Sequence, residues 1–117
     1  MAYDEGLAQR IRDALDDQLG VSEKKMFGGI AFMINGNMSV GVVDEKLMVR
    51  GGPDTWDEWL SQPGVDKMDF TGRPMKGWIW VHGSVLDDEE TIRLWVSRGR
   101  DFACSLPAKP EKETRFG

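Results

Sequence analysis

Apolar residues recur along the chain with two different periods, and the changes of period divide it into helices and strands. The first unit has an apolar residue at every fourth position, at Leu7, Ile11, Leu15 and Leu19. This spacing lines one face of an α-helix, and Gly20, directly after the last apolar position, suits a helix C-cap. We therefore predict an amphipathic helix from Asp4 to Leu19.

The period changes to two between Glu23 and Arg50, which is typical of β-strands. Asn35-Gly36 is a strong hairpin signal, because a type I′ turn needs a positive φ at both central residues. A second tight turn is expected near Asp44-Glu45, and the two turns predict a meander of three strands. The expected partners across these strands are Met33 with Met38, Ala31 with Val40, Val42 with Leu47, and Val40 with Val49.

In this register one face of the meander is wholly apolar and is expected to face the core. Its residues are Ala31, Met33, Met38, Val40, Val42, Leu47 and Val49. The second face mixes apolar and charged side chains, namely Ile30, Phe32, Ile34, Lys46, Met48 and Arg50. Neither water nor a dry core suits this mixture, so we expect the second face to contact a partner or a ligand. On it, Ser39 and Gly41 are predicted to form a shallow trough between Phe32 and Met48.

The second half of the chain predicts a short helix followed by two strands. Pro53 to Gln62 suggests the helix, and Met68 to Phe70 and Gly77 to Val85 suggest the strands, joined by a turn at Thr71 to Pro74. Along the second strand Trp78 and Trp80 point to one side, whereas Ile79 and Val81 point to the other. A strand that is apolar on both sides is expected to be covered on both.

The last helix is predicted from an apolar stripe that comprises Ile92, Trp95, Val96, Gly99, Phe102, Ala103 and Leu106. Asp87 is the expected N-cap, Glu90 completes a capping box, and Pro107 ends the helix. The order of elements is therefore α-β-β-β-α-β-β-α. We predict one α+β domain over residues 1–107, with three helices and an antiparallel sheet of about five strands, followed by a flexible tail at 108–117.

Composition restricts the classes of protein to which the chain can belong. Its 117 residues suit one domain with a single core, and no apolar run approaches the roughly 20 residues that span a bilayer. The net charge of −5 argues against direct binding of nucleic acid, because such binding depends on Lys and Arg contacts with phosphate. The acidic, polar start of the chain does not resemble a secretory signal, so a cytoplasmic location is expected.

Few residues suit catalysis or metal binding. Cys104 and His82 are the only cysteine and histidine, so no internal disulfide and no Cys- or His-rich metal site is predicted. His82 has no predicted nucleophile beside it, and Cys104 has no second cysteine to resolve an oxidised thiol. The glycine pairs Gly28-Gly29 and Gly51-Gly52 match no phosphate-binding motif. We therefore expect no enzyme activity, no catalytic residue, no metal and no cofactor.

Basic residues offer a candidate for a charged patch. Those that flank the predicted strands and the turn are Lys24, Lys25, Arg50, Arg73 and Lys76. They form a patch beside Trp78 if these strand ends converge. Otherwise they are ordinary surface charge, balanced by the 20 acidic residues. The sequence leaves both interpretations open, and ordinary surface charge is the simpler one.

Three segments form a recognisable combination in this order. They are Lys25-Met26-Phe27-Gly28-Gly29, then Leu47-Met48-Val49-Arg50 after the hairpin, then Met68-Asp69-Phe70-Thr71-Gly72-Arg73-Pro74-Met75-Lys76-Gly77-Trp78. Together they resemble the TfoX N-terminal family, and the third segment looks like its short, stand-alone branch. The resemblance extends from about Tyr3 to Lys109. It implies an α+β fold similar to the one predicted above, and it implies neither an enzyme activity nor catalytic residues.

The family's namesakes are regulators of natural competence, thought to act as transcriptional coactivators beside a DNA-binding protein, and longer members carry a second, helical domain. We therefore expect a regulatory protein-interaction module with a coactivator-like accessory role. The expected assembly is a homodimer, since twofold symmetry is the commonest oligomeric arrangement, and a regulator protein is a further expected partner. Candidate residues for binding are Phe32, Ser39, Gly41, Met48, Arg50, Arg73, Lys76 and Trp78. The alternative is a small-ligand or anion-binding domain that uses the trough, and an enzyme of unknown chemistry is third.

Overall fold

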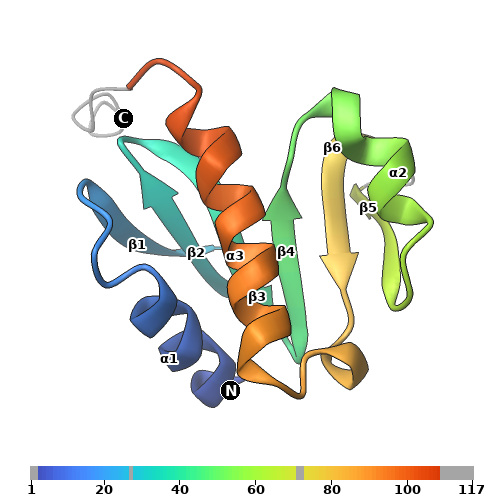
Figure 1. Cartoon of the computed structure of the whole chain (residues 1–117), viewed down its shortest axis with the longest axis horizontal. Coiled ribbons are helices and arrows are strands. Elements are labelled where there is room, and N and C mark those ends of the chain that lie inside the picture. The colour runs from blue at the N-terminus through green and yellow to red at the C-terminus, as the bar shows by residue number, and fades with distance from the viewer. Residues whose placement is uncertain (1–2, 27, 71–72, 109–117) are drawn as a thin grey trace.

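Helices lie against one face of an antiparallel β-sheet in the computed structural model (Figure 1), which describes residues 3–26, 28–70 and 73–108. The helices are α1 (Glu5–Ala14), α2 (Trp56–Leu60) and α3 (Glu89–Cys104). The strands are β1 (Val21–Met26), β2 (Gly29–Ile34), β3 (Asn37–Val43), β4 (Lys46–Arg50), β5 (Val65–Phe70) and β6 (Arg73–Val81). Two short 3-10 turns, η1 (Pro53–Thr55) and η2 (Gly83–Val85), precede α2 and α3.

The sheet has six strands in the order β1-β2-β3-β4-β6-β5. The α+β class and the three helices are as predicted, and the additional strand is β1, which pairs with β2 from Val21 opposite Ile34 to Met26 opposite Gly29. The sequence signal for β1 is weak because its four central residues are polar. Edge strands commonly carry charged residues, which discourage pairing with other chains.

Helix α1 is shorter than predicted. Its N-cap is Asp4, whose carboxylate accepts a hydrogen bond of 3.0 Å from the Leu7 backbone N–H, and its C-cap is Leu15 rather than Gly20. Leu19 is therefore outside the helix and 84% exposed, contrary to the predicted stripe. The acidic residues Asp13, Asp16 and Asp17 follow one another near the helix C-terminus, where the helix dipole disfavours negative charge.

The β2–β3 hairpin has the predicted turn and an unpredicted bulge. Asn35 and Gly36 have φ values of 53° and 82°, as a type I′ turn requires, and Met33 faces Met38 as predicted. The register then shifts, so that the residues paired next are Phe32 with Val40, and Ala31 with Gly41. The predicted pairing of Ala31 with Val40 is wrong, because Ser39 is an extra residue on β3.

This bulge exchanges the two faces of β2, because a one-residue shift turns every side chain of a strand to the opposite side. The large residues Ile30, Phe32 and Ile34 join the main core beneath the helices, whereas Ala31, Met33 and Met38 lie on the other face. These two sets are the reverse of the prediction. The core positions Val40, Val42, Leu47 and Val49 are confirmed, as are the pairings of Val42 with Leu47 and Val40 with Val49.

Strands β5 and β6 form a hairpin that bends at Gly77. Gly77 has a φ of 94°, and its carbonyl oxygen accepts hydrogen bonds from the backbone N–H groups of Gly51 and Gly52, at 2.9 and 3.2 Å. Both strands start earlier than predicted, and Arg73 and Pro74 belong to β6 rather than to the turn. Thr71 and Gly72 lie outside the described residues. The two pairs lie on opposite sides as predicted, with Ile79 and Val81 facing the main core and Trp78 and Trp80 on the other side.

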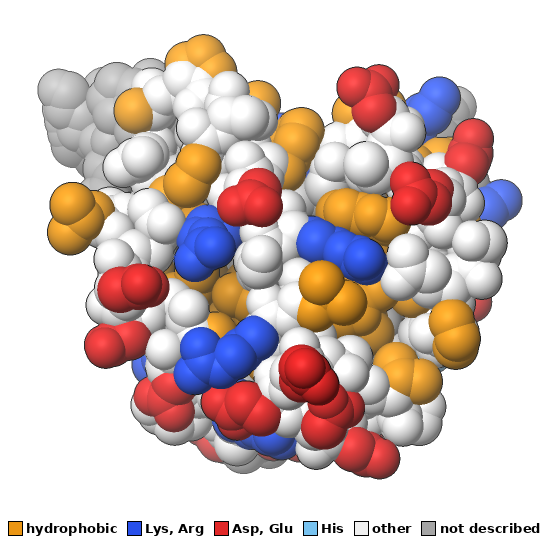
Figure 2. Space-filling model, viewed as in Figure 1, with side chains coloured by type: hydrophobic (Ala, Val, Ile, Leu, Met, Phe, Trp, Pro, Cys, Tyr) orange, Lys and Arg blue, Asp and Glu red, His pale blue; other side chains and the backbone are white. Residues whose placement is uncertain are grey.

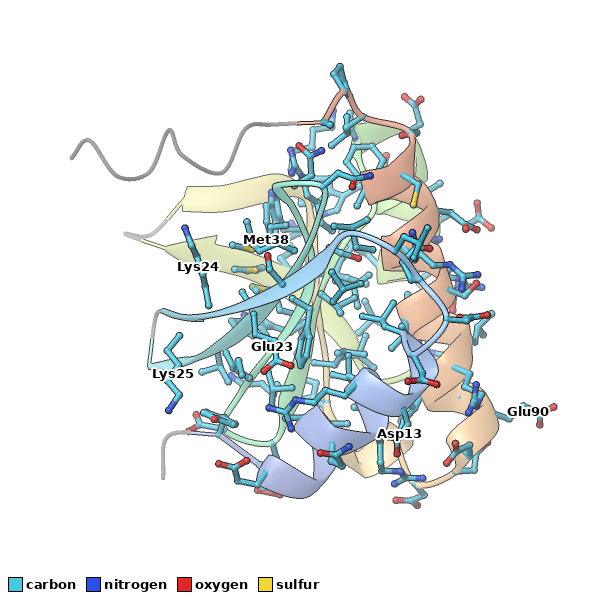
Figure 3. All side chains as sticks on the ribbon, turned by 90° about the vertical axis from the view of Figure 1, so that its left-hand side faces the viewer. Asp13, Glu23, Lys24, Lys25, Met38 and Glu90 are labelled. Atoms are coloured by element: carbon cyan, nitrogen blue, oxygen red, sulfur yellow. The ribbon has the colours of Figure 1, made fainter. Side chains whose placement is uncertain are left out.

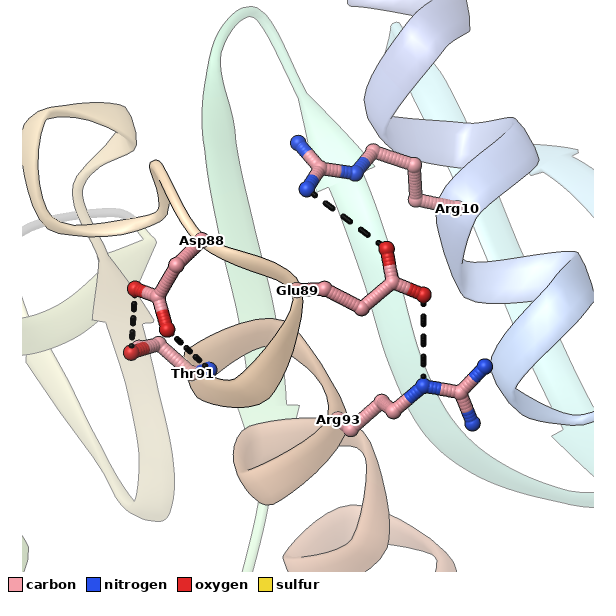
Figure 4. Close-up of polar contacts among 5 residues, drawn as sticks. All are labelled: Arg10, Asp88, Glu89, Thr91 and Arg93. Carbon is pink, nitrogen blue, oxygen red and sulfur yellow. Dashed lines mark hydrogen bonds and ion pairs between the residues drawn. The ribbon is translucent and has the colours of Figure 1, made fainter.

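Helix α3 begins one residue later than predicted. Its N-cap is Asp88 rather than Asp87, and the Asp88 carboxylate accepts hydrogen bonds from the Thr91 hydroxyl at 2.8 Å and the Thr91 backbone N–H at 3.1 Å (Figure 4). These bonds lower the pKa of Asp88. The next residue, Glu89, lies 3.7 Å from Arg10 of α1 and 3.2 Å from Arg93, so it links the two helices.

The main core lies between the helices and the sheet. Its residues in α3 are Ile92, Trp95, Val96 and Ala103, and Gly99 is also buried, whereas Phe102 and Leu106 are only partly buried. Trp95 packs edge-on against Trp59 of α2, with ring centres 5.4 Å apart. On the helix side, acidic and basic side chains are interspersed over the surface (Figure 2). In the described ranges, no helix is long and apolar enough to cross a membrane.

Candidate functional site

The sheet face turned away from α1 and α3 carries a cluster of methionine and tryptophan side chains. Ala31, Met48 and Met68 are fully buried in this cluster, and Met33, Met38, Trp78 and Trp80 are partly buried around them. We call these seven residues the methionine face. All three helices place their buried residues in the other cluster, between helices and sheet. The methionine face is therefore the surface that the helices leave uncovered.

The alternation of side chains along the strands assembles this face. Met48 of β4 lies opposite Trp80 of β6, and directly opposite residues share a face of the sheet. The bulge at Ser39 turns Ala31 and Met33 to the same side. Met68 comes from β5, next to a register shift between Lys67 and Asp69. Methionine and tryptophan side chains from five neighbouring strands thus meet on one surface.

The predicted trough above Ser39 and Gly41 is not formed. A Cβ atom added at Gly41 would lie 2.6 Å from Cε of Met48, so the Met48 side chain already fills the space above this glycine. Ser39 is fully buried and lies against α3, since a Cβ atom added at Gly99 would be 3.2 Å from its hydroxyl oxygen. Phe32, the expected wall of the trough, is fully buried in the main core.

Arg50 lies where β4 ends, at one end of the methionine face. Its guanidinium carbon is 5.2 Å from the centre of the Trp78 ring and 5.4 Å from that of Phe102. The side chain is partly buried, and burial lowers the pKa of the guanidinium, although arginine remains charged at neutral pH. Arg50 forms no salt bridge within the part of the chain that the structure describes.

Lys46 lies at the other end of β4, with its Nζ atom 4.7 Å from the centre of the Trp80 ring. Nearby, Nε2 of His82 and a carboxylate oxygen of Asp66 form a hydrogen bond of 2.5 Å. These side chains share an open depression of about 540 Å³ whose lining is Lys46, Leu60, Val65, Asp66, Lys67, Trp80 and His82. The depression joins the methionine face at Trp80.

A third cation, Lys24, lies on the same side at the β1 edge. Lys24 is opposite Ala31 in the register and is exposed. Figure 3 shows Lys24 and Met38 on the side away from α1 and α3. Its neighbour Glu23 turns towards α1, where it accepts hydrogen bonds of 2.7 and 3.0 Å from Arg12. The hydrogen bond with Glu23 raises the pKa of Arg12.

The basic residues highlighted in the sequence do not form one patch. Strands β2 and β3 separate β1 from β4, so Lys24 and Arg50 are about 14 Å apart across the sheet at the usual strand spacing. Lys76 is exposed on β6. Arg73 belongs to β6, but its side chain lies outside the described residues. Lys24 and Arg50 therefore lie at different edges of the methionine face instead of gathering at one end of the sheet.

Several residues of this surface escaped the sequence analysis. Met48, Arg50 and Trp78 were identified as candidates and lie together at the face, whereas Met33, Met38, Met68 and Trp80 were not proposed for binding. Lys46 was placed on the second face of the meander but was not among the candidate residues. The missed signal is the number of methionines, seven in 117 residues, combined with the alternation that sets Trp80 on the same side as Trp78. Methionine is unbranched and polarizable, and it is frequent at adaptable binding surfaces.

Residues with catalytic potential are scattered through the fold. Cys104 is exposed at the end of α3. His82 contacts Asp66, and the acidic residues Asp88 and Glu89 cap α3 and bind Arg10 and Arg93. Among the described side chains, no group of three or more His, Cys, Asp or Glu residues is placed to hold a metal ion.

Comparisons with known proteins bear on the family of this chain. Neither curated proteins nor solved structures gave a significant match. Among protein-family models, that of the TfoX N-terminal domain matches residues 13–103, a range that contains all six strands, α2 and nearly all of α3. This match confirms the resemblance seen in the sequence motifs. The chain therefore belongs to the TfoX N-terminal domain family.

Proposed function

We propose that the chain is a non-enzymatic regulatory module of the cytoplasm that binds a protein through the methionine face. The observation that carries this proposal is the partial exposure of Met33, Met38, Trp78 and Trp80 on a sheet face that the helices leave uncovered. Aromatic residues, methionine and arginine are enriched in protein interfaces relative to other surfaces. Apolar side chains gathered at one place on a surface mark a site of interaction.

Family membership supports a regulatory role, because the namesakes of the TfoX N-terminal family regulate natural competence. A coactivator-like accessory acts by contacting another protein, which is a task for a surface rather than for a catalytic centre. Two occupants of the methionine face follow from this view, either a second copy of the chain, as the sequence predicts, or a different regulator. The small-ligand alternative is not carried forward, since Met48 fills the trough on which it depended.

Photo-crosslinking in cells that naturally express the protein tests the proposal. A photoreactive amino acid in place of Met38 is expected to form an adduct with a protein, because Met38 is partly exposed on the methionine face. The matched control places it at Leu94, a side chain of α3 that is 47% exposed. After identification by mass spectrometry, the purified partner is expected to bind wild type and to lose affinity for Met38→Glu. Adducts formed from Leu94 but not from Met38 would contradict the proposal.

A further inference from the structure

We infer that the methionine face binds an acidic amphipathic segment of a protein partner. The apolar side chains of that segment would contact the methionines and tryptophans, and its carboxylates would contact Lys24, Lys46 and Arg50. This inference rests on the proposed function, because it names the kind of partner that the same surface accepts. It is argued from the charge around the face, the hydrogen-bonding capacity of its cations and their spacing.

Three cations lie around the face, although the chain as a whole is acidic. The chain has 20 acidic and 15 basic residues, hence a net charge of −5. On the helix side, Arg10 and Arg93 are paired with Glu89, whereas Arg98 donates a hydrogen bond to Gln62. Within the described residues, neither Lys24, Lys46 nor Arg50 forms a salt bridge. Asp66, which lies opposite Trp80 in the sheet, is engaged with His82.

The two cations of β4 contact aromatic rings, and neither forms a salt bridge within the described residues. Arg50 lies over Trp78 and Phe102, and Lys46 lies over Trp80. A cation–π contact orients the charged group against the ring face and leaves its N–H donors available. A guanidinium with available donors favours a carboxylate, which it can bind through two parallel hydrogen bonds. The face therefore offers fixed donors beside apolar surface.

The spacing of these cations suits a segment that runs along β4. Arg50 is four positions after Lys46, which corresponds to about 13 Å along a strand. Two carboxylates seven or eight residues apart share one face of a helix and lie about 11–12 Å apart at 1.5 Å per residue, which is close to this spacing. The apolar residues between them would then lie over Met48 and Trp80, which are opposite one another in the sheet. An amphipathic helix with acidic residues at both ends of its apolar stripe has this pattern.

Other occupants fit the charges less well. A second copy of the chain would bring a second set of Lys24, Lys46 and Arg50 to the same interface, and like charges brought together oppose association. Nucleic acid would satisfy the cations, but it would not cover Met33 and Met38, and the chain's net charge of −5 repels a polyanion. The partner favoured by the face is therefore an acidic protein segment.

Isothermal titration with two synthetic peptides tests this inference. Both peptides form an amphipathic helix of about four turns with the same leucine and phenylalanine stripe; one carries Glu at the flanking positions and the other carries Gln. We expect the Glu peptide to bind wild type at least tenfold more tightly than the Gln peptide. We also expect Arg50→Gln and Lys46→Gln each to weaken the Glu peptide severalfold. Arg98→Gln is the matched control, because Arg98 also lies over two aromatic rings, on the helix side.

The possible results separate this inference from the proposed function. Equal binding of both peptides, lost in Met38→Glu, would keep the face as a protein-binding site and overturn the acidic partner. Failure of both peptides to bind would also overturn it, while the crosslinking result at Met38 would still decide the proposed function. Tight binding of a DNA duplex that Arg50→Gln abolishes would show a nucleic-acid surface instead. Melting temperatures of all variants within a few degrees of wild type would exclude unfolding as the cause.

Discussion

Two arginines of this chain make similar aromatic contacts but differ in their remaining hydrogen bonds. Arg98 lies 4.5 Å from the Trp95 ring centre and 5.4 Å from that of Trp59, and it donates a hydrogen bond of 3.1 Å to the Gln62 side chain. Arg50 has comparable contacts with Trp78 and Phe102. Arg98 therefore ties α3 to the loop after α2, whereas Arg50 presents its donors at the edge of the methionine face.

Two buried polar residues of β3 are expected to respond oppositely to truncation. The Asn37 side chain donates a hydrogen bond of 2.9 Å to the Pro107 carbonyl oxygen, whereas the Ser39 hydroxyl has no hydrogen-bond partner among the described residues. A buried polar group without a partner carries an uncompensated desolvation cost. We expect Ser39→Ala to leave the free energy of unfolding unchanged or raise it by up to about 1 kcal/mol, and Asn37→Ala to lower it by about 1–2 kcal/mol.

Urea unfolding of both variants, followed by circular dichroism, measures this difference. A loss of stability in Ser39→Ala as large as that in Asn37→Ala would show that the Ser39 hydroxyl has a hydrogen-bonding role in the fold.

Ser39 has a structural role that differs from the one predicted from the sequence. Ser39 was a candidate for ligand binding, and its buried position against Gly99 of α3 identifies it instead as the residue that completes the bulge.

At the scale of elements, the pattern of the chain predicted the helices and the hairpin turns but not the bulge. Turns are encoded locally, as Asn35-Gly36 illustrates, whereas a bulge is decided by the packing of the whole strand. A signal was present in side-chain volume. The unshifted register would have buried Ala31 and Met33 and exposed Ile30, Phe32 and Ile34. It would therefore have left the larger apolar side chains in water and buried less apolar area. Gaining the burial of these three residues explains why the extra residue is accommodated.

Because the bulge in β3 was not predicted, some candidate site residues were assigned to the wrong face of the sheet. Residues beyond the bulge, such as Met48, Arg50 and Trp78, were placed on the correct face because the turn at Asp44 and the alternation in β6 fix their positions. Phe32 was placed on the wrong face because its position depends on the register of β2. The position of Met68 could not be predicted, because it depends on the bend of the β5–β6 hairpin at Gly77. That bend in turn depends on contacts with Gly51 and Gly52, which are distant in the sequence.

The cap of α3 gives a prediction for the dependence of stability on pH. The pKa of Asp88 lies below its ordinary value, first because of the hydrogen bond from the Thr91 hydroxyl and second because of that from the Thr91 backbone N–H. A depressed pKa in the folded state means that the stabilisation is fully present above the ordinary value and is lost as the pH falls through the depressed value. Asparagine can also cap a helix but does not titrate.

We therefore expect the advantage of wild type over Asp88→Asn in melting temperature to shrink as the pH falls below about 4. Differential scanning calorimetry from neutral to acidic pH would follow this difference. Asp87→Asn is the control, because Asp87 precedes the cap, and its profile should run parallel to that of wild type. Parallel profiles for Asp88→Asn as well would mean that the capping carboxylate does not contribute to the pH dependence.

At the scale of the whole molecule, the sheet separates two surfaces of different character. The helix side carries interspersed charges of both signs (Figure 2), several of them in salt bridges. The opposite side combines the methionine face with cations that have no salt bridge among the described residues. The net charge of −5 therefore conceals a local excess of positive charge. Averaging over the chain hides such an asymmetry, which is why composition alone pointed to no charged partner.

This asymmetry predicts that salt has opposite effects on the binding of an acidic peptide to the face and on the binding of a second copy of the chain. Above about 0.1 M salt, where the Debye length is about 10 Å, the attraction between the cations and an acidic peptide should weaken. Self-association through the same face should strengthen, because salt screens repulsion between like charges while the apolar contact remains. Titration calorimetry with the Glu peptide and light scattering of the chain alone, over the same salt series, measure both. A dimer that forms at low salt and dissociates at high salt would contradict this prediction, because it would show that opposite charges hold the two copies together.

The positions of the tryptophans have a practical consequence. Trp78 and Trp80 belong to the methionine face, whereas Trp56, Trp59 and Trp95 lie on the helix side. Indole emission depends on the polarity around the ring, so an occupant that removes water from Trp78 and Trp80 should shift the emission to shorter wavelength. Phenylalanine substitutions at these two positions would remove that response and leave the emission of the other three. The fluorescence of Trp78 and Trp80 thus reports directly on binding at the methionine face. Unlabelled candidate partners can be screened by the shift in emission that they cause.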